Sequence, residues 1–436
     1  MSRTEPMLQT RVDAAFEYAY PLFAIAETRF RAVQDPRNPD RHAPNTVRHN
    51  RQLSDHDSRW ITAPNNDTLY SNAWLDLSSG PVRIRLGAMP AGRYWSLALM
   101  DAFTNHIAML GQRLDGSGPV DVTLLGPGQP DAAVPGRVIR APGNDVWLFG
   151  RWLVDGADDL PQSHAMQDRL EVLPPIGVSH SPRVVPERSA DPRNFLAVVN
   201  ESLARNPVPA SESGLLEAWA RVGLRPGAVD AWHEIDEAAR QAWAARIDAV
   251  HDTLRSSGKS RRRDVQGWMA SASDIGNYGR NFALRASVAL GGLGALEPVE
   301  AMYFVAYQDA ERQPLDGRKR YRLQVPAGGI PTDSFWSFSM YEATADGQRF
   351  FVENPIRRYS IGNRTPGLVR KPDGGLDIAL QHEAPPDAGG LANWLPAPAG
   401  PFQIALRTYL PRAELRDGHA PMPVIHARPN RRSFHD

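Results

Sequence analysis

The chain has 436 residues, of which 42% are hydrophobic and 22% charged. Its 49 basic residues match its 49 acidic residues, so the formal net charge is zero. This balance excludes a strongly basic nucleic-acid-binding protein and an acidic solvating tail. No cysteine is present, which excludes disulfides, thiolate catalysis and cysteine-ligated metal centres. The length predicts two or three globular domains.

Neither a membrane span nor an export signal is predicted. No run of about 18 apolar residues occurs anywhere in the sequence, so we expect no membrane insertion. Near the N-terminus, the apolar run 18–26 contains Pro21 and is flanked by Glu17 and Glu27, without a cleavage pattern after it. We therefore expect a cytoplasmic protein.

The apolar spacing divides the chain into four parts. Residues 1–58 contain a predicted helix at 8–34 and then a polar arm, and residues 59–173 contain short runs typical of β structure. A linker and helical segment follows at 174–294, with helices expected at 240–254 and 267–290, before a second β region at 295–436. The expected strands are 75–77, 82–86, 94–100, 106–110, 120–124, 146–154, 303–308, 321–325, 335–341, 376–381 and 402–410.

The two β regions share a pattern. Tyr94-Trp95-Ser96 begins one strand of the first region, and Phe335-Trp336-Ser337 begins one of the second. Arg151 follows an alternating strand near the end of the first region, and Arg407 follows one near the end of the second. We therefore predict a fold that is mainly β with α: two related β-sandwich or jelly-roll-like domains, separated by a helical segment, plus an N-terminal helix. Chance similarity between two pairs of strands is the alternative.

The segment before the first long strand is the most unusual one in the sequence. Asn65, Asn66, Asp67 and Tyr70 fall within six residues, where loops of a sandwich present polar groups to ligands. We expect Asp67 and Tyr70 to be catalytic and the two asparagines to bind substrate. The alternative is a turn that leads into a strand, because Asn and Asp also stabilise turns.

A second candidate cluster follows the strand that begins at Trp95. Asp101 and Asn105 end that strand, and His106 begins the next one. A carboxylate and an imidazole in this arrangement could act as an acid–base pair, with Asn105 binding substrate. A capped hairpin is the alternative.

Arginines and one tryptophan form the third set of candidates. Arg140, Arg151, Arg364 and Arg407 could clamp an anion, and Trp394 could rim the same pocket. For Arg151 and Arg407 the notable alternative, which we favour, is a structural ion pair with an Asp of the same sandwich, since an inward-facing arginine must be paired or must face an anion. For Arg364 and Trp394 it is a solvated surface loop. No close-spaced metal-ligand pair and no nucleotide-binding motif is found, so we expect neither a metal nor a cofactor.

Several longer motifs resemble a known two-domain family. The first β region resembles the DUF1254 domain, and the second resembles the DUF1214 domain. The resemblance implies two β-rich domains with helices between them, but it implies no settled activity and transfers no catalytic residues. Many relatives carry an export signal, which this sequence lacks. The motifs are Pro64–Ser71, Leu75–Leu77, Gly80-Pro81, Arg93-Tyr94 and Asp101, then Phe335–Ser337, Asn354-Pro355, Arg358–Gly362, Asn393–Pro396 and Arg407–Pro411.

Three hypotheses for the function remain open. The first is a cofactor-independent enzyme that hydrolyses or eliminates a small polar or anionic organic molecule in a cleft between the β domains. The second is a non-catalytic protein that binds a small molecule or carbohydrate. The third is a structural or assembly protein, for which a homo-oligomer would be expected.

Overall fold

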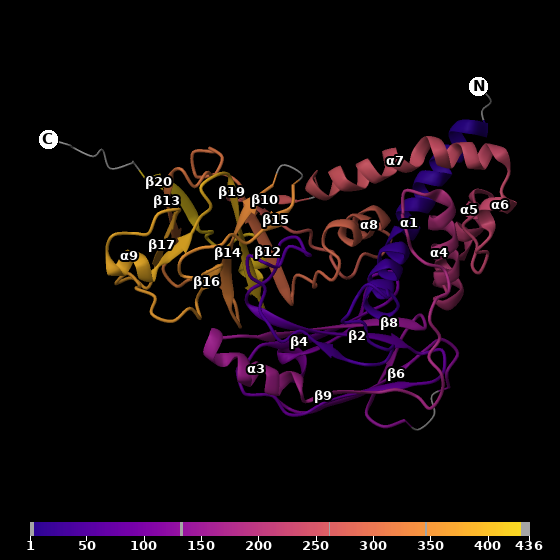
Figure 1. The fold of residues 1–436 in the computed structure, drawn as a ribbon, viewed down its shortest axis with the longest axis horizontal. Helices are drawn as coiled ribbons and strands as arrows, with labels where there is room; N and C mark the ends of the chain where they lie inside the picture. Colours follow the sequence, from indigo (N-terminus) through magenta and orange to yellow (C-terminus); the bar gives the residue numbers. More distant parts are fainter. Residues whose placement is uncertain (1–3, 131–133, 261, 345–346, 429–436) are drawn as a thin grey trace.

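The structure is a computed structural model that describes residues 4–130, 134–260, 262–344 and 347–428. Two β-rich bodies lie side by side, one drawn in indigo to magenta and the other in orange to yellow, with most of the helices gathered at one end (Figure 1). This architecture confirms the predicted fold class, mainly β with α, with an N-terminal helix. Within the described residues, no helix is long and apolar enough to cross a membrane.

The first body is built from two sheets that share an apolar core. Its inner sheet, which faces the second body, and its outer sheet pack through residues such as Leu97 and Ile84. In spatial order the inner sheet contains β1 (Arg48–His49), β2 (Thr68–Asp76), β8 (Asp145–Leu153), β4 (Trp95–Met100) and β5 (His106–Gly111). The outer sheet contains β7 (Arg137–Arg140), β6 (Val120–Leu125), β3 (Val82–Leu86) and β9 (Leu170–Leu173).

The second body repeats this plan. Its inner sheet faces the first body, and residues such as Phe338 and Leu323 join it to an outer sheet. The inner sheet contains β10 (Arg263–Val265), β11 (Trp268–Ala270), β12 (Ala301–Ala306), β19 (Phe402–Tyr409), β14 (Trp336–Ala343) and β15 (Arg349–Phe350), with β16 (Ser360–Gly362) also paired to β14. The outer sheet contains β18 (Trp394–Pro396), β17 (Leu376–Gln381), β13 (Arg320–Val325) and β20 (Val424–Arg428).

Strand alternation decides which side chains reach the interface between the bodies. Along β4, Trp95 and Leu97 point into the core of the first body. Ala98 and Met100 point the other way and join an interface cluster that includes Phe335 of the second body. Because successive side chains of a strand alternate between its two faces, each inner sheet has one face for its own core and one for this interface cluster, which α1 joins through Ile25.

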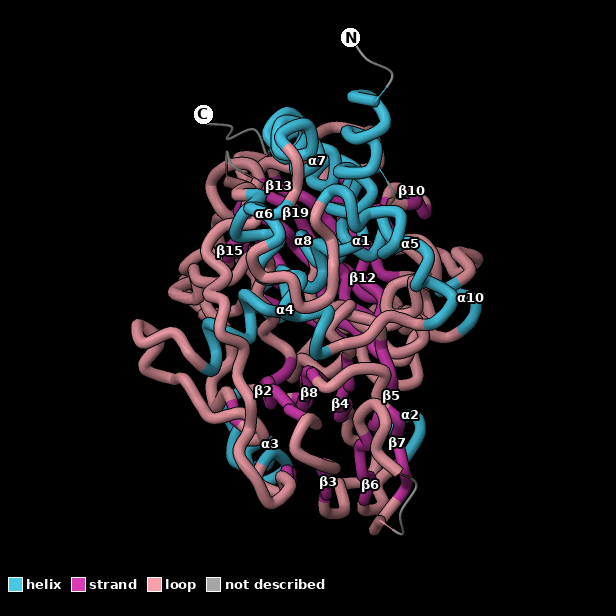
Figure 2. The backbone as a smooth tube through the Cα atoms, turned by 90° about the vertical axis from the view of Figure 1, so that its right-hand side faces the viewer, coloured by secondary structure: helices cyan, strands magenta, loops and turns pink. Residues whose placement is uncertain are grey.

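The helices form a third packed unit. α1 crosses this unit and packs against α7 and α4, with Phe16, Phe195 and Trp243 in its core. Figure 2 shows these helices at one end of the molecule and strands β3 and β6 at the opposite end. The helices are α1 (Thr4–Val33), α4 (Pro192–Arg205), α5 (Ser213–Trp219), α6 (Ala231–Glu234), α7 (Glu237–Ser260) and α8 (Phe282–Gly291). Shorter helices are α2 (Gln112–Asp115), α3 (Leu160–Gln167), α9 (Ala388–Ala392), α10 (Ala413–Arg416), η1 (Ala157–Asp159), η2 (Ala210–Glu212) and η3 (Ala220–Val222).

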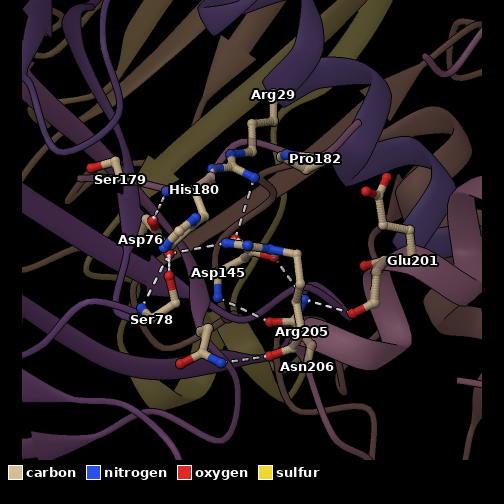
Figure 3. Close-up of polar contacts among 12 residues, drawn as sticks. Arg29, Asp76, Ser78, Asp145, Ser179, His180, Pro182, Glu201, Arg205 and Asn206 are labelled. Atoms are coloured by element: carbon tan, nitrogen blue, oxygen red, sulfur yellow. Dashed lines mark hydrogen bonds and ion pairs between the residues drawn. The ribbon is translucent and has the colours of Figure 1, made fainter. Parts of the chain in front are cut away.

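A buried ion-pair network joins the helical unit to the first body. Arg29 of α1 lies 3.3 Å from Asp145 at the start of β8. Arg205 of α4 contacts Asp145 at 2.7 Å and Asp76 of β2 at 2.9 Å, as Figure 3 shows. Burial works to raise the pKa of Asp145, but Arg29 and Arg205 outweigh it and the pKa is lowered. Four charges from four elements thus stabilise one junction.

The helix predicted at 267–290 is wrong in its first half. Residues 268–270 form the strand β11, and α8 begins only at Phe282. Gly276 and Gly279 have positive φ angles that interrupt a helix. Asn281 then accepts a hydrogen bond from the backbone N–H of Leu284, which caps the shorter helix at its true start.

Candidate functional site

The two inner sheets carry matching rows of side chains. In the first body a row crosses four neighbouring strands, and in the second body a row with the same residue types crosses the four corresponding strands. The Arg151 row contains Tyr70, Arg151, Ser96 and Gly111. The Arg407 row contains Tyr303, Arg407, Ser337 and Gly362. The Trp–Ser and arginine positions that look alike in the sequence are therefore equivalent in strand register.

The glycine that ends each row allows close packing against the serine strand. A Cβ atom at Gly111 would lie 2.9 Å from the carbonyl oxygen of Trp95, and one at Gly362 would lie 2.1 Å from that of Trp336. Neither distance is compatible with a side chain at that position. The similarity of the two rows thus extends to their backbone packing.

A carboxylate precedes the tyrosine of each row by three residues and contacts the opposite body. Asp67 accepts hydrogen bonds from Ser337 (2.6 Å) and Ser360 (3.1 Å) of the second body. Glu300 accepts one from Tyr94 of the first body, at 3.0 Å, and another from Arg113, at 2.9 Å. Burial raises the pKa of both carboxyl groups, against the effect of Arg407 on Asp67 and of Arg113 on Glu300. Each body therefore supplies a buried acid to the other.

Arg407 is fully engaged by its surroundings. One terminal nitrogen donates to Ser339, and the other donates to the carbonyl oxygens of Ala63 (3.1 Å) and Pro64 (2.9 Å). The loop that carries these carbonyls continues to Asn65, whose amide donates to the hydroxyls of Tyr70 and Tyr409. The first body thus covers the guanidinium of the second body.

Arg151 is about as buried as Arg407, at 4% exposure, but its guanidinium makes fewer hydrogen bonds. Its Nη2 donates to the carbonyl oxygen of Gly294 at 2.7 Å, whereas Nε and Nη1 have no hydrogen-bond partner among the described residues. No described carboxylate lies within 4.0 Å of it. Burial works to lower the pKa of Arg151, but its pKa is raised by four neighbouring tyrosines: Tyr303, Tyr70, Tyr409 and Tyr94.

The surroundings of Arg151 include an imidazole and three part-exposed rings. The pKa of His106 is lowered to about 4, first by burial and then by Arg151, so the imidazole is neutral at neutral pH. Its Nδ1 lies 3.7 Å from Glu297. Tyr70, Phe149 and Tyr303 each keep part of their surface accessible although they belong to the interface. Some aromatic surface close to the guanidinium is therefore accessible to solvent.

Five of the twelve predicted site residues meet at this interface, and His106 lies near it. The five are Asn65, Asp67, Tyr70, Arg151 and Arg407. The prediction that Asp67 lies at an open loop mouth is corrected, because Asp67 is 8% exposed and both its oxygens accept from serines of the second body. The expected ion pair of Arg151 or Arg407 with an Asp of its own sandwich is absent from the described residues.

Six predicted residues lie elsewhere. Asn66 donates to the carbonyl oxygen of Ser54 within its loop. Asp101 accepts from the backbone of Phe103 and from Asn105, so both residues close the hairpin between β4 and β5. Burial raises the pKa of Asp101.

Arg140, Arg364 and Trp394 are separate from one another. Arg140 is exposed on β7 of the outer sheet, and Arg364 pairs at the surface with Asp155 of the first body. Trp394 was expected in a pocket rim, but it is 1% exposed in β18 and donates to the carbonyl oxygen of Gln381 at 2.8 Å. Trp394 belongs to a strand that pairs with β17, which explains its burial. The prolines and glycines around it in the sequence had suggested a surface loop.

The sequence analysis missed Glu300, Tyr94, Tyr303 and Tyr409. The signal for Glu300 was present, because aligning the two rows on Tyr70 and Tyr303 places Glu300 at the position of Asp67. One further cluster could hold a cation by distance alone: ligand atoms of Asp55, His56 and Asp57 lie within 4.8 Å of one another. Since Arg357 pairs with Asp55 and Tyr359 bonds His56, contacts with the second body already account for this cluster.

Comparison with known proteins agrees with the architecture. Residues 44–174 match the family described as "Protein of unknown function (DUF1254)", and residues 300–413 match "Protein of unknown function (DUF1214)". All eight residues of the two rows fall within these matches. The chain therefore belongs to the two-domain family that combines DUF1254 with DUF1214.

One solved structure supports the fold and no more than the fold. The crystal structure of the VPA0106 protein from Vibrio parahaemolyticus matches with a TM-score of 0.74 at 22% identity, covering 97% of this chain and 100% of that one. An uncharacterised protein from Burkholderia cenocepacia matches with a TM-score of 0.46 at 14% identity, covering 98% of this chain and 94% of that one. No curated protein matches the sequence.

Proposed function

We propose that the protein binds a small organic anion between its two inner sheets, with Arg151 as the anchor. The observation that carries this proposal is the pair of unpartnered nitrogens, Nε and Nη1, on a guanidinium that is 4% exposed. Burying a guanidinium that makes a single hydrogen bond costs free energy, because its other N–H groups lose their hydrogen bonds to water. An incoming anion would offset part of this cost by accepting from Nε or from Nη1, which lie on opposite edges of the guanidinium.

The surroundings of Arg151 favour a small ligand with a single negative charge. Glu300 already acts on Arg151 electrostatically, and His106 is neutral at neutral pH. The site therefore offers one guanidinium charge that is partly balanced, which suits a monoanion better than a dianion. The accessible parts of Tyr70, Phe149 and Tyr303 provide the approach.

Binding is tested by thermal unfolding in the presence of small anions. We expect acetate, benzoate or phosphate to raise the Tm of the wild-type protein with increasing concentration, since a ligand that binds only the folded state stabilises it. Arg151→Gln should abolish that response, whereas exposed Arg140→Gln should keep it. The proposal is wrong if none of the three anions shifts the Tm, or if Arg151→Gln responds as the wild-type protein does.

Catalysis is a second candidate function for the same site. The expectation of hydrolysis or elimination through Asp67 or Asp101 stays a prediction. Both carboxylates accept hydrogen bonds, which also fits a positioning role. The observation that favours catalysis is the neutral imidazole of His106, 3.7 Å from Glu297 and within electrostatic reach of Arg151. A neutral imidazole held near a carboxylate is a potential general base.

A simple ester tests the catalytic candidate. We expect the wild-type protein to release nitrophenolate from 4-nitrophenyl acetate faster than the buffer does, and His106→Gln to lose that excess while keeping the Tm response to anions. Equal release by both proteins would remove His106 from the chemistry.

A further inference from the structure

We infer that a second site, in a cleft between the second body and the start of α8, binds a short peptide with free ends. Its ammonium group would bind Glu297 and its carboxylate group would bind Arg416. This inference goes beyond the proposed function, because the cleft contains neither Arg151 nor Arg407. It follows from the size of the cleft, from two charged side chains that lack partners, and from the strands that separate them.

The cleft is large enough for a small ligand. Its volume is about 920 Å³, which lies within the range of ligand pockets in proteins. The walls come from β10, from the loop between β11 and α8, from the segment before β12 and from the end of α10. Ile275, Leu284 and Val299 give the walls an apolar part. The cleft therefore combines apolar surface with charged groups.

Arg263 and Arg416 form the basic end of the cleft. Arg263 donates to the backbone oxygens of Arg416 (2.9 Å) and Asp417 (3.3 Å), so β10 holds the end of α10 in place. In contrast, Nε of Arg416 is buried without a hydrogen-bond partner, and no described carboxylate forms an ion pair with its guanidinium. The side chain of Asp417 is exposed. Arg416 can therefore bind an anionic group of a ligand.

Glu297 and Asp274 form the acidic end. A Cβ atom at Gly276 would lie 2.8 Å from Cγ of Glu297, so the Glu297 side chain packs against the loop that carries Asp274. The carboxylate of Glu297 accepts no hydrogen bond from a described residue. The basic group beside it, Nδ1 of His106 at 3.7 Å, belongs to a neutral imidazole. Burial raises the pKa of Glu297, against the effect of Arg113. A ligand ammonium would supply the missing positive charge.

Two strand spacings separate the basic end from the acidic end. Arg263 of β10 is paired with Ala270 of β11, and Ala270 is paired with Phe304 of β12. The backbone oxygen of Glu297 accepts from the N–H of Ala301, where β12 begins. Neighbouring strands lie about 4.8 Å apart, so β10 and β12 are about 10 Å apart. An extended tripeptide has this length, at about 3.3 Å per residue, and a single amino acid does not.

A short peptide with free ends matches the groups of the cleft. A terminal carboxylate can accept from two nitrogens of a guanidinium such as Arg416, and a terminal ammonium can donate to Glu297. Between the ends, peptide groups can bond the side chains of Ser271 and Asn277, and an apolar side chain can lie against Ile275. A dianion or a dication would leave the charge of one end unbalanced.

Calorimetric titration with trialanine tests the inference. We expect trialanine to bind the wild-type protein about tenfold more tightly than N-acetyl-trialanine or trialanine amide, because each blocked peptide lacks one terminal charge. Glu297→Gln should remove the preference over the acetylated peptide, and Arg416→Gln should remove the preference over the amide. Glu383→Gln and Arg320→Gln, which alter an exposed ion pair outside the cleft, should retain both preferences.

Several outcomes would overturn the inference. Trialanine and its blocked forms could bind equally, or trialanine could fail to bind. Either preference could persist in the folded variant that should remove it, which would place the peptide elsewhere. If alanine binds as tightly as trialanine, the ligand does not join the two ends. None of these results affects the proposed function, because the anion response of the Tm is measured separately through Arg151→Gln.

Discussion

The Arg151 row and the Arg407 row have the same residue types in the same strand order, yet their guanidinium groups have different surroundings. Arg407 donates to a serine of its own body and to two carbonyl oxygens of the opposite body. Arg151 bonds one carbonyl oxygen. Ala98 lies opposite Phe149 where Ser339 lies opposite Ala405, so Arg151 lacks the hydroxyl that accepts from Arg407. Within one scaffold, equivalent arginines thus differ in having three hydrogen-bond acceptors or one.

The largest expected effect comes from removing each guanidinium in turn. Arg407→Met should lower the free energy of unfolding by about 3–5 kcal/mol, because it leaves buried acceptors unpaired and removes the charge that acts on Asp67. Arg151→Met should change it by no more than about 1 kcal/mol, or should stabilise the protein, because the lost guanidinium has one partner. Urea unfolding followed by tryptophan fluorescence measures both, with Arg140→Met as the exposed control. Equal losses would contradict the contrast between the rows.

Exchanging the serine and alanine that flank the rows should have a smaller effect. Ser339→Ala should cost about 1.5–3 kcal/mol, because a buried charged donor loses its acceptor. Ala98→Ser should instead supply Arg151 with an acceptor and weaken benzoate binding, as measured by calorimetry. The fold is expected to tolerate both changes, since the side chains are similar in size. Unchanged benzoate affinity in Ala98→Ser would show that Nη1 does not bind the ligand.

The smallest expected effect is a pH dependence of stability. It distinguishes Asp67, whose carboxylate contacts the opposite body, from Asp145 in the ion-pair network. Because the pKa of Asp67 is raised in the folded protein, its contribution to stability is complete below about pH 4 and is lost as the pH rises through the folded pKa. Between pH 4 and 7, the free energy of unfolding of Asp67→Asn should therefore rise relative to that of the wild-type protein, by at most about 1.4 kcal/mol per pH unit. Asp145, whose pKa is lowered, provides the matched control.

For that control the sign is opposite. The stability contributed by Asp145 is present above its unfolded pKa and is lost as the pH falls through the folded pKa. The free energy of unfolding of Asp145→Asn should therefore fall relative to that of the wild-type protein as the pH rises. Parallel curves for Asp67→Asn and Asp145→Asn in urea unfolding at several pH values would contradict the opposite pKa shifts.

Local patterns were sufficient to predict much of the fold. The strands at 82–86 and 376–381 were predicted with the bounds that the structure shows, because apolar alternation and flanking turn residues define them locally. The likeness of Trp95-Ser96 to Trp336-Ser337 also predicted positions that proved equivalent in register. The helix expected at 267–290 failed because positive-φ glycines outweigh an apolar spacing.

The candidate site was harder to predict because its contacts span long distances in the sequence. Asp67 lies 270 residues from Ser337, its hydrogen-bond partner, and no local pattern records such a pair. Trp394 and Asp101 show the converse error: residue types that often bind ligands are used here to complete a sheet and a hairpin. What the sequence does contain is the equivalence of Asp67 and Glu300, which becomes visible only when the two rows are aligned.

The exchange of carboxylates between the bodies resembles the contacts of an isologous dimer, in which residue i of one subunit meets residue j of the other and the reverse. Here both partners belong to a single polypeptide, so their stoichiometry is fixed and their association does not depend on protein concentration. Cutting the chain between the bodies would leave each half with serine or tyrosine hydroxyls that have lost their acid. Fragments of this protein should therefore recover these interface hydrogen bonds only when the two halves are mixed.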